Sequence, residues 1–527
     1  MRQCESSFGR WSVVVLLSVV PFVGCIPQAQ EQGQPAAPPV ETATSSGLTL
    51  AQHVNTCVSD PRVQLGLVSS DVCAGAELFF REDFGGNERT CATCHPANHN
   101  YTIDPTFIST LPATDPLFVA EQVPALAQLE KPALMRQYGL ILENVDDTSD
   151  PTNRFVMRSV PHCLSLGTSV TAQAVPTDGT TRPPNQRTGW SGDGAPNQGE
   201  LRDFQTGAVV QHYTKSLSRT AGTDFVLPTS DELDKIVAFT STIGRSNELT
   251  LANLSLSDSG AEAGRLTYLT PAARCNGCHN NAGANVAAGF NRNFNTGVER
   301  SRIADLNTQG IPFDGGFGGP GVTAFNFDAS GDGILDSYGN GTFNTPPLIE
   351  AADTGPFFHT NAFPTIESAI TFYTTASFAS SPAGAGAAIP LSPTDIANLG
   401  RFLRVLNAAF NCQMALARIN ADIAIIGSYN NHERDIQQQM AALALAEVND
   451  ALADLSAVAS LNVAAQSSLL AAQSSLQDAA TNASHTHRLS SAQAALASVS
   501  IANGSLSATP AGATALTFTM GQGVLMF

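Results

Sequence analysis

The chain has 527 residues, 43 % of them hydrophobic, so it is long enough for several domains with a sizeable buried core. Acidic residues outnumber basic ones by 45 to 26, which gives a formal net charge of −19. This excess argues against nucleic acid and anionic membrane surfaces as partners, and it is compatible with a basic redox protein.

The first 25 residues have the features of a secretory signal. Two arginines precede an apolar run over residues 11–23, which is too short to span a bilayer. The run leads into Phe22-Val-Gly-Cys25, which is similar to a bacterial lipobox. We therefore expect an exported lipoprotein, periplasmic or anchored to the outer membrane of a Gram-negative bacterium through Cys25. A plain signal peptide with an incidental cysteine is the alternative.

Two short stretches, Cys91-Ala-Thr-Cys94-His95 and Cys275-Asn-Gly-Cys278-His279, have the spacing C-x-x-C-H, which is the signature of covalent c-type haem attachment. In such sites two thiols add to the vinyl groups of one porphyrin, and the adjacent imidazole is the proximal ligand of the iron. Neither stretch has the second ligand pair at short range that a zinc site needs. We expect two covalently bound haem c groups. A thioredoxin-like or disulfide C-x-x-C is the alternative.

Four cysteines remain beyond the signal, the lipobox and the two motifs. In an oxidising compartment, four thiols favour two disulfides. We expect one between Cys57 and Cys73, which are close in sequence, and one between Cys163 and Cys412, which would join the two haem regions. The alternative is that some of the four are buried free thiols.

The chain is expected to be mainly α-helical, with two cytochrome c-like domains and a helical extension. Residues 26–48 are rich in Pro, Gln, Ala and Thr and are expected to form a flexible linker. The two haem domains are expected at residues 49–255 and 256–412, because a helical segment precedes each motif in the same way. The Ala-rich residues 413–527 have a heptad-like pattern, so we expect a helical hairpin or coiled-coil arm that could mediate oligomerisation. The end of this segment alternates like a strand and is expected to pack back onto the body.

Four stretches between the motifs and residue 412 carry a resemblance. They are Gly189-Trp-Ser-Gly-Asp-Gly194, Phe343-Asn-Thr-Pro-Pro-Leu348, Thr354-Gly-Pro-Phe-Phe-His359 and Thr365-Ile-Glu-Ser-Ala-Ile-Thr-Phe-Tyr373. They look like the F-W-D-G-R, F-K-T-P-x-L, T-A-P-Y-F-H and T-L-E-E-V-V stretches of the dihaem cytochrome c peroxidase and MauG-like family. The resemblance covers residues 60–412. It implies reduction of hydrogen peroxide at the N-terminal haem, with electrons from a small redox protein entering through the C-terminal haem.

The resemblance also implies axial ligands. The residue that closes the T-L-E-E helix is the second ligand of the C-terminal haem in the family, and here it is Tyr373. A phenolate stabilises ferric iron and should give a low potential. His359 is the rival ligand, and a core aromatic is the other interpretation of Tyr373. For the first haem, His162 is either the sixth ligand or a plain core histidine, whereas the short tether to His95 keeps His99 from the opposite face.

Peroxide chemistry also needs an acid–base group beside an open coordination position. The glutamate that the family uses aligns near residues 201–203, so the resemblance implies Asp203 in this role, with Glu200 as the alternate. A solvated surface position is the other interpretation. The family has a tryptophan between its haems, and Trp190 is the only tryptophan of the mature chain, although it aligns to the F-W-D-G-R stretch.

Two calcium sites are considered. Thr354 and Pro356 match family positions whose backbone carbonyls bind a calcium between the haems. Independently, a loop at residues 328–339 follows the first nine positions of an EF-hand, although Gly339 stands where a bidentate Glu is usual. Its expected ligands are Asp328, Ser330, Asp332 and Asp336. A plain Asp/Gly turn is the alternative interpretation of this loop. The short H-x-H at residues 485–487 could bind a metal weakly, and a solvated loop is its alternative interpretation.

Two other functions compete with the peroxidase. One is a pure electron-transfer cytochrome in which both irons are six-coordinate and no peroxide is turned over. The other is a MauG-like enzyme that oxidises a protein substrate.

Overall fold

The computed structural model describes residues 49–144, 154–171, 186–192, 200–317, 325–508 and 510–527. The expected signal, the lipobox cysteine Cys25 and the linker lie outside these residues, as does the end of the Gly189–Gly194 stretch. The described chain is mainly α-helical, which confirms the expected fold class. Among the described residues, no helix is long and apolar enough to cross a membrane.

The first motif forms the short helix α4 (Cys91–Cys94), which follows the longer helix α3 (Ser70–Arg81). Helix α3 packs against α10 (Ser230–Thr240) and against α1 (Leu50–Ser59), and the Cys57–Cys73 disulfide joins α1 to α3 as expected. The other helices of this half are α2 (Pro61–Gln64), α5 (Pro105–Thr110), η1 (Pro116–Phe118), α6 (Val119–Gln122), η2 (Pro124–Leu126), α7 (Pro132–Tyr138), α8 (Leu166–Ser169), α9 (Leu201–His212) and η3 (Leu251–Asn253).

The second motif forms α12 (Cys275–Cys278) and follows α11 (Ser259–Leu269), which packs against α16 (Pro393–Tyr429). Helices α14 (Ile366–Phe372) and α16 begin at the capping boxes of Thr365 and Ser392, where the apolar pattern predicts helices to start. The other helices here are η4 (Asn280–Ala282), η5 (Val298–Ser301), α13 (Ala304–Thr308), η6 (Ala351–Asp353) and α15 (Ala376–Ala379).

The two helix pairs α3/α10 and α11/α16 cross in the same way, at a glycine. A Cβ atom on Gly75 of α3 would lie 1.9 Å from the carbonyl oxygen of Lys235 on α10. A Cβ atom on Gly264 of α11 would lie 2.0 Å from the carbonyl oxygen of Asn398 on α16. Only a residue without a side chain allows backbones to approach this closely, so the glycine sets both crossings.

Aromatic side chains repeat in register with these glycines. Four residues after the glycine, Phe79 of α3 meets Phe239 of α10 with ring centroids 5.1 Å apart. At the equivalent place, Tyr268 of α11 meets Phe402 of α16 at 5.4 Å. The region before each motif is therefore built twice on one plan.

The strands are few. Strand β1 (Leu140–Glu143) pairs antiparallel with β2 (Val156–Ser159). Strand β5 (Ser337–Asn344) pairs antiparallel with β3 (Asn293–Phe294) and parallel with β4 (Phe313–Gly316), in the order β3-β5-β4. The chain after β2 leads to the first motif, and the chain after β5 leads to the second motif.

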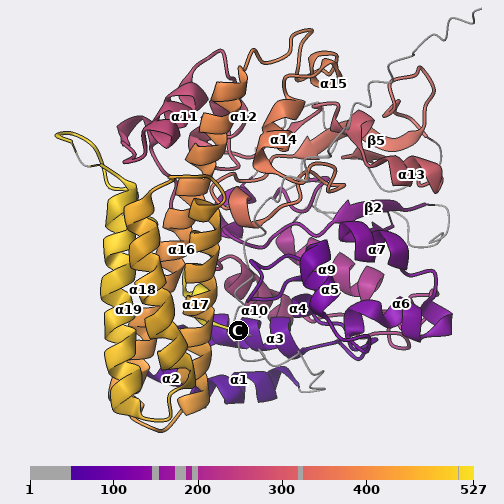
Figure 1. Cartoon of the computed structure of the whole chain (residues 1–527). Helices are drawn as coiled ribbons and strands as arrows, with labels where there is room; N and C mark the ends of the chain where they lie inside the picture. The colour runs from indigo at the N-terminus through magenta and orange to yellow at the C-terminus, as the bar shows by residue number, and fades with distance from the viewer. Residues whose placement is uncertain (1–48, 145–153, 172–185, 193–199, 318–324, 509) are drawn as a thin grey trace, which may run out of the picture. The chain divides into compact units, whose positions relative to one another are not determined.

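The extension is a bundle rather than a hairpin. Helices α17 (Arg434–Ser456), α18 (Val463–Thr481) and α19 (His485–Leu506) stand beside the second half of α16, and each packs on the next so that α19 returns to α16 (Figure 1). Helix α16 runs without a break across residue 412, so the extension begins inside the helix that packs against α11, before the second motif. Buried residues of α18 follow heptad spacing and are mostly alanine, which lets the helices approach closely: Ala465, Leu469, Ala472, Leu476 and Ala479.

The C-terminal segment packs back onto the body, as expected, but it makes only isolated bridges and no continuous strand among the described residues. Ser507 bridges Leu256, and Met520 bridges Arg245. The final 3₁₀ turn η7 (Gln522–Leu525) lies against α3, α10 and α16, so the chain ends beside the helix that precedes the first motif (Figure 1).

Candidate functional site

Both C-x-x-C-H motifs line one cavity of about 980 Å³, at the upper end of the range for ligand pockets. Its walls include the motif residues Cys91, Cys94, His95, Cys275, Cys278 and His279. All four of these thiols are free, so neither pair forms the disulfide that was the alternative interpretation. Burial raises the pKa of Cys91 to about 11 and that of Cys275 to about 12, which keeps both as neutral thiols.

The two motif histidines are held in the same way. His95 Nδ1 lies 2.8 Å from the carbonyl oxygen of Tyr101, and His279 Nδ1 lies 2.9 Å from that of Pro346. A carbonyl can only accept, so Nδ1 carries the proton and donates it in both residues. In each case Nε2 is left without a hydrogen-bond partner among the described residues, on a side chain that lines the cavity. Burial lowers the pKa of both imidazoles to about 4. A neutral imidazole with Nδ1 oriented by a carbonyl is the form that ligates a metal, so these residues fit haem iron.

Tyrosines flank both motifs. Tyr213, which follows α9, donates its hydroxyl to Cys91 Sγ at 3.2 Å, and Tyr268 donates to the carbonyl oxygen of His279 at 2.5 Å. These contacts hold each C-x-x-C turn against a neighbouring helix.

Trp190 lines the cavity and is hydrogen-bonded to the ends of β2 and β5. Its indole Nε1 donates to the carbonyl oxygen of Ser159 at 2.8 Å, at the end of β2, and the backbone nitrogen of Asn344 donates to the carbonyl oxygen of Trp190 at 2.8 Å. Asn344 is two residues before Pro346, whose carbonyl accepts from His279. Two hydrogen bonds and a short length of chain thus join this tryptophan to the second motif, which its place in the F-W-D-G-R-like stretch did not predict.

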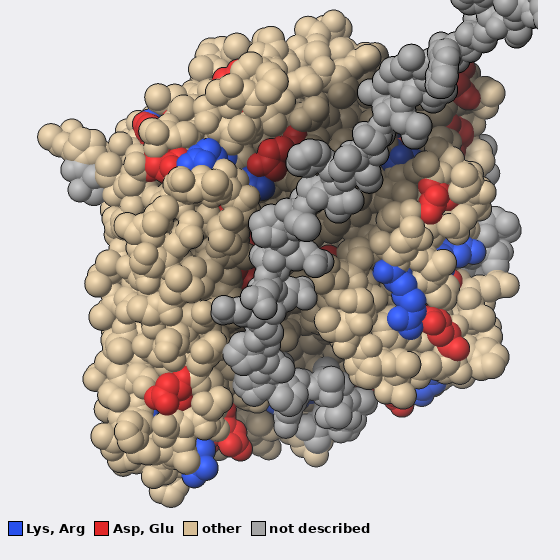
Figure 2. All heavy atoms as spheres, viewed as in Figure 1, with Lys and Arg blue, Asp and Glu red and all other residues tan. Residues whose placement is uncertain are grey.

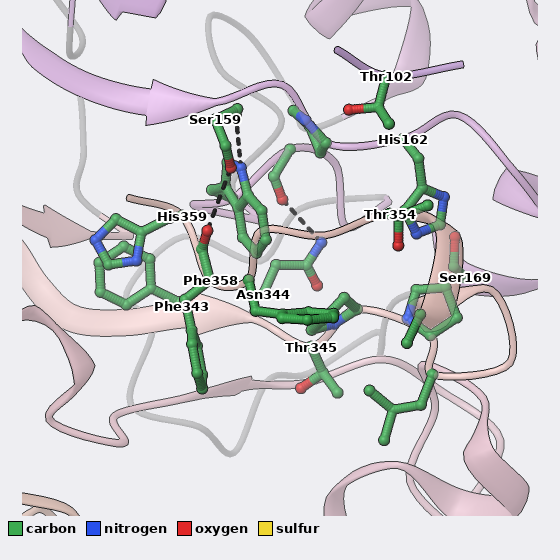
Figure 3. Close-up of a pocket in the computed structure, with 18 of the residues that line it drawn as sticks. Thr102, Ser159, His162, Ser169, Phe343, Asn344, Thr345, Thr354, Phe358 and His359 are labelled. Carbon is green, nitrogen blue, oxygen red and sulfur yellow. Dashed lines mark hydrogen bonds between the residues drawn. The ribbon is translucent and has the colours of Figure 1, made fainter. Parts of the chain in front are cut away.

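Tyr373 and His359 both line the cavity, in different surroundings. Tyr373 ends α14, and the thiols of Cys278 and Cys275 add to the burial that raises the pKa of its phenol, so the phenol is close to the second motif. His359 Nε2 lies 2.7 Å from a carboxylate oxygen of Glu299, and its ring stacks on Phe343 at 4.0 Å (Figure 3). The Glu299 contact occupies one of the two ring nitrogens of His359.

Asp203 and Glu200 do not line the cavity. They form the capping box at the start of α9, in which the Asp203 carboxylate accepts from the backbone nitrogen of Glu200 at 3.4 Å. The residues of α9 that line the cavity are instead Leu201, Phe204, Gln205, Ala208 and His212.

Sequence reasoning missed His212 and Gln205. Burial lowers the pKa of His212 to about 3, with Arg89, Arg219 and His95 adding to the effect, so its imidazole is neutral. The Gln205 amide donates to Thr240 Oγ1 at 3.3 Å, and its buried oxygen has no partner among the described residues. Gln205 and His212 are spaced so that they lie on one face of a helix, and this spacing could have identified them in the sequence.

His162 lines the cavity, and its Nδ1 is buried without a hydrogen-bond partner among the described residues. The next residue, Cys163, has its Sγ 3.3 Å from His95 Nδ1. The expected Cys163–Cys412 disulfide is wrong, because both thiols are free. Cys412 is fully buried on α16, where Asp454 of α17 adds to the burial that raises its pKa, whereas Cys163 is held against the first motif.

The two calcium candidates differ in kind. Thr354 and Pro356 line the cavity, and the Thr354 hydroxyl donates to the carbonyl oxygen of Glu350 at 2.9 Å. In the loop before β5, oxygens of Asp328, Asp332 and Asp336 lie within 4.8 Å of one another, and the Ser330 hydroxyl bonds to Asp328. Backbone amides also donate to Asp328 and hold the pKa of its carboxyl below the usual range. His485 and His487 begin α19, away from both candidates.

Comparisons with known proteins identify no family. No family model and no curated protein matches the chain. Among solved structures, a chain of the hydrazine synthase of Kuenenia stuttgartiensis, pressurised with 20 bar xenon, matches with a TM-score of 0.30 and 14 % identity, covering 71 % of this chain and 96 % of that one. This TM-score is too low to establish a common fold.

Proposed function

We propose that the protein is a dihaem c-type cytochrome with peroxidase-like activity, which reduces hydrogen peroxide at the N-terminal haem with electrons delivered through the C-terminal haem. The observation that carries the proposal is the shared cavity, into which both C-x-x-C-H motifs open with Nδ1 of each histidine bonded to a carbonyl oxygen.

Cys91, Cys94 and His95 would hold one haem, and Cys275, Cys278 and His279 the other. When bound, each haem supplies one-electron redox chemistry at an iron whose potential its axial ligands tune. The phenol of Tyr373 is the proposed second ligand at the C-terminal haem. The crossing of α3 with α10 repeats in the crossing of α11 with α16, which supports two cytochrome c-like units. In each crossing, the helix that carries the glycine is the one that precedes a motif.

The chain's own residues supply the connection between the two sites. The Trp190 indole is bonded to Ser159 on one side, and its backbone is bonded to Asn344 on the other. Hydrogen bonds and short covalent segments couple redox centres better than gaps do, so we propose this tryptophan as part of the electron route. A small redox protein is the proposed donor. Figure 2 shows charged side chains of both signs scattered over this face rather than gathered in one patch, so the view gives no docking site for it.

Haem counting tests the proposal. The purified protein should contain two covalent haems, and replacing Cys91 and Cys94 together by Ala should remove one. The same change at Cys275 and Cys278 should remove the other. The matched control is the pair Cys163→Ala and Cys412→Ala, which changes two thiols outside the motifs and should leave two haems. A haem content that neither motif pair alters would overturn the proposal.

A pure electron-transfer cytochrome is the second candidate, because His212, a histidine outside the motif, lines the cavity near His95. It could fill the sixth position and leave no site for peroxide. Stopped-flow mixing of half-reduced protein with peroxide separates the two functions. Turnover well above that of free haem supports the peroxidase, whereas low-spin iron in every redox state with no turnover supports the carrier. Oxidation of an added protein by the peroxide-treated form would indicate the MauG-like function.

We also propose that the protein is exported and lipid-anchored. The Cys57–Cys73 disulfide is consistent with an oxidising compartment. Cys25→Ser should move the protein from the membrane fraction to the soluble fraction without loss of haem, and a wild type that is already soluble would exclude the anchor.

Calcium is proposed as a second cofactor, at the oxygens around Asp332. Asp332→Asn should lower the calcium content of the purified protein, whereas Asp305→Asn, at an acidic position outside the loop, should not. Equal calcium in all three proteins would exclude this site.

A further inference from the structure

We propose that His212, and not Asp203, is the acid–base residue beside the first haem. The inference rests on the peroxidase function proposed above, which needs a group that takes a proton from one peroxide oxygen and gives it to the other. Histidine is the side chain most often used for such transfers.

The cavity-facing stripe of α9 determines which of the two residues can act. Residues three and four apart lie on one helix face, and Gln205, Ala208 and His212 follow this spacing along the cavity wall. Asp203 lies off this stripe and caps the helix start instead. His212 is half-buried and lines the cavity. No hydrogen-bond partner for its ring nitrogens is found in the part of the chain that the structure describes.

Helix α9 is fixed to the first motif at the end that carries His212. The Tyr213 hydroxyl donates to Cys91 Sγ, and the Asn87 side-chain amide donates to the carbonyl oxygen of His212 at 2.9 Å. The backbone nitrogen of Asn87 in turn donates to the carbonyl oxygen of Tyr213 at 2.9 Å. These bonds hold the His212 side chain at a fixed place near the first motif.

The other histidines of the cavity are less suited to the role. The segment that carries His162 lies behind His95, because Cys163 contacts His95 Nδ1, and the Thr102 hydroxyl donates to Val160 at 2.6 Å. In His95, Nδ1 is on the side of the ring that faces away from the iron that Nε2 would ligate. The segment with His162 therefore lies on that side and not beside the peroxide. His359 is held by Glu299.

His212 would move one proton between the two peroxide oxygens. A neutral imidazole can accept the proton of one peroxide oxygen. The imidazolium then returns that proton to the departing oxygen, which leaves as water. Both peroxide hydrogens thus leave on the first water, and the remaining oxygen becomes the second water with two protons from solvent and two electrons, which the redox protein donor would supply.

Cyanide binding to the ferric protein tests the inference independently of turnover. Hydrogen cyanide must lose its proton to bind iron, so a base beside the iron speeds its association. In His212→Leu we expect association to slow by about 10²–10⁴-fold, the usual effect of losing an acid–base group. His212→Gln, which keeps a polar side chain of similar size, should slow it comparably. The matched controls Asp203→Asn and His487→Leu should bind cyanide like the wild type.

Three results would overturn the inference. The first is wild-type cyanide association in both His212 variants. The second is slowed association in Asp203→Asn. The third is a change of the first haem from low-spin to high-spin iron in His212→Leu, which would identify His212 as an axial ligand. Haem content, measured first on every variant, separates these results from failure of the proposed function, in which no variant contains two covalent haems.

Discussion

Replacing Gly264 by Ala should separate the two helices that carry the second motif region. An added Cβ would lie 2.0 Å from the carbonyl oxygen of Asn398 and 2.9 Å from Cβ of Phe402, whereas ordinary van der Waals contact begins near 3.4 Å. Both obstacles are part of, or directly attached to, the backbone of α16. Helix α11 must therefore move away by more than an ångström, which would disturb the packing of Tyr268 on Phe402.

The expected loss combines two opposing terms. Overpacking costs up to about 3 kcal/mol when the neighbours cannot yield. Alanine is favoured over glycine within a helix by about 1 kcal/mol. The free energy of unfolding of Gly264→Ala should therefore fall by about 2 kcal/mol. Gly75→Ala should behave alike, because its Cβ would lie 1.9 Å from Lys235.

Urea unfolding followed by far-UV circular dichroism measures this effect. Gly427 is the matched control, since it lies in the same helix α16 and an added Cβ would meet nothing within 4 Å. Gly427→Ala should leave the midpoint unchanged or raise it, by up to about 1 kcal/mol of stability. Equal midpoints for Gly264→Ala and Gly427→Ala would refute the close-crossing argument.

Three further predictions concern single side chains. Tyr373→Phe should change the spectrum and potential of one haem if the phenol ligates; a change in His359→Ala alone would transfer that role to His359. Burial alone would lower the pKa of His53, but Glu77 and Glu82 outweigh it and raise the pKa to about 9. The folded pKa of His53 exceeds the unfolded value near 6.5, so the charged imidazole stabilises the fold by about 3 kcal/mol below pH 6.5. This stabilisation is lost as the pH rises through about 9. The urea midpoints of wild type and His53→Gln should therefore converge there. Arg418→Met should cost about 3–5 kcal/mol, because it leaves Glu447 buried without its partner at 2.5 Å, whereas exposed Arg434→Met should have almost no effect in the same assay.

Local signals of the sequence were sufficient for several features of the fold. The helix starts at Thr365 and Ser392 were predictable because a capping box joins residues only three apart. The Cys57–Cys73 disulfide was predictable because a short segment joins the two cysteines. The spacing C-x-x-C-H was informative for a similar reason, since the chemistry of attachment acts within five consecutive residues.

The arrangement of the site depends on contacts that no local pattern encodes. Cys163 lies against His95 rather than Cys412, and Asp203 caps α9 while His212 of the same helix lines the cavity. The family resemblance indicated the residues at the start of α9, but it did not indicate which face of α9 lines the cavity.

By itself, the sequence determined the two attachment motifs, the helical class of the protein and the positions of several helix ends. Only the tertiary structure decided that both motifs share one cavity, that α16 continues from the second motif region into a four-helix bundle, and which residues line the cavity wall. The physical reason is range: caps and covalent spacing act between residues a few positions apart, whereas packing brings together residues separated by a hundred positions or more, as at Trp190 and Asn344.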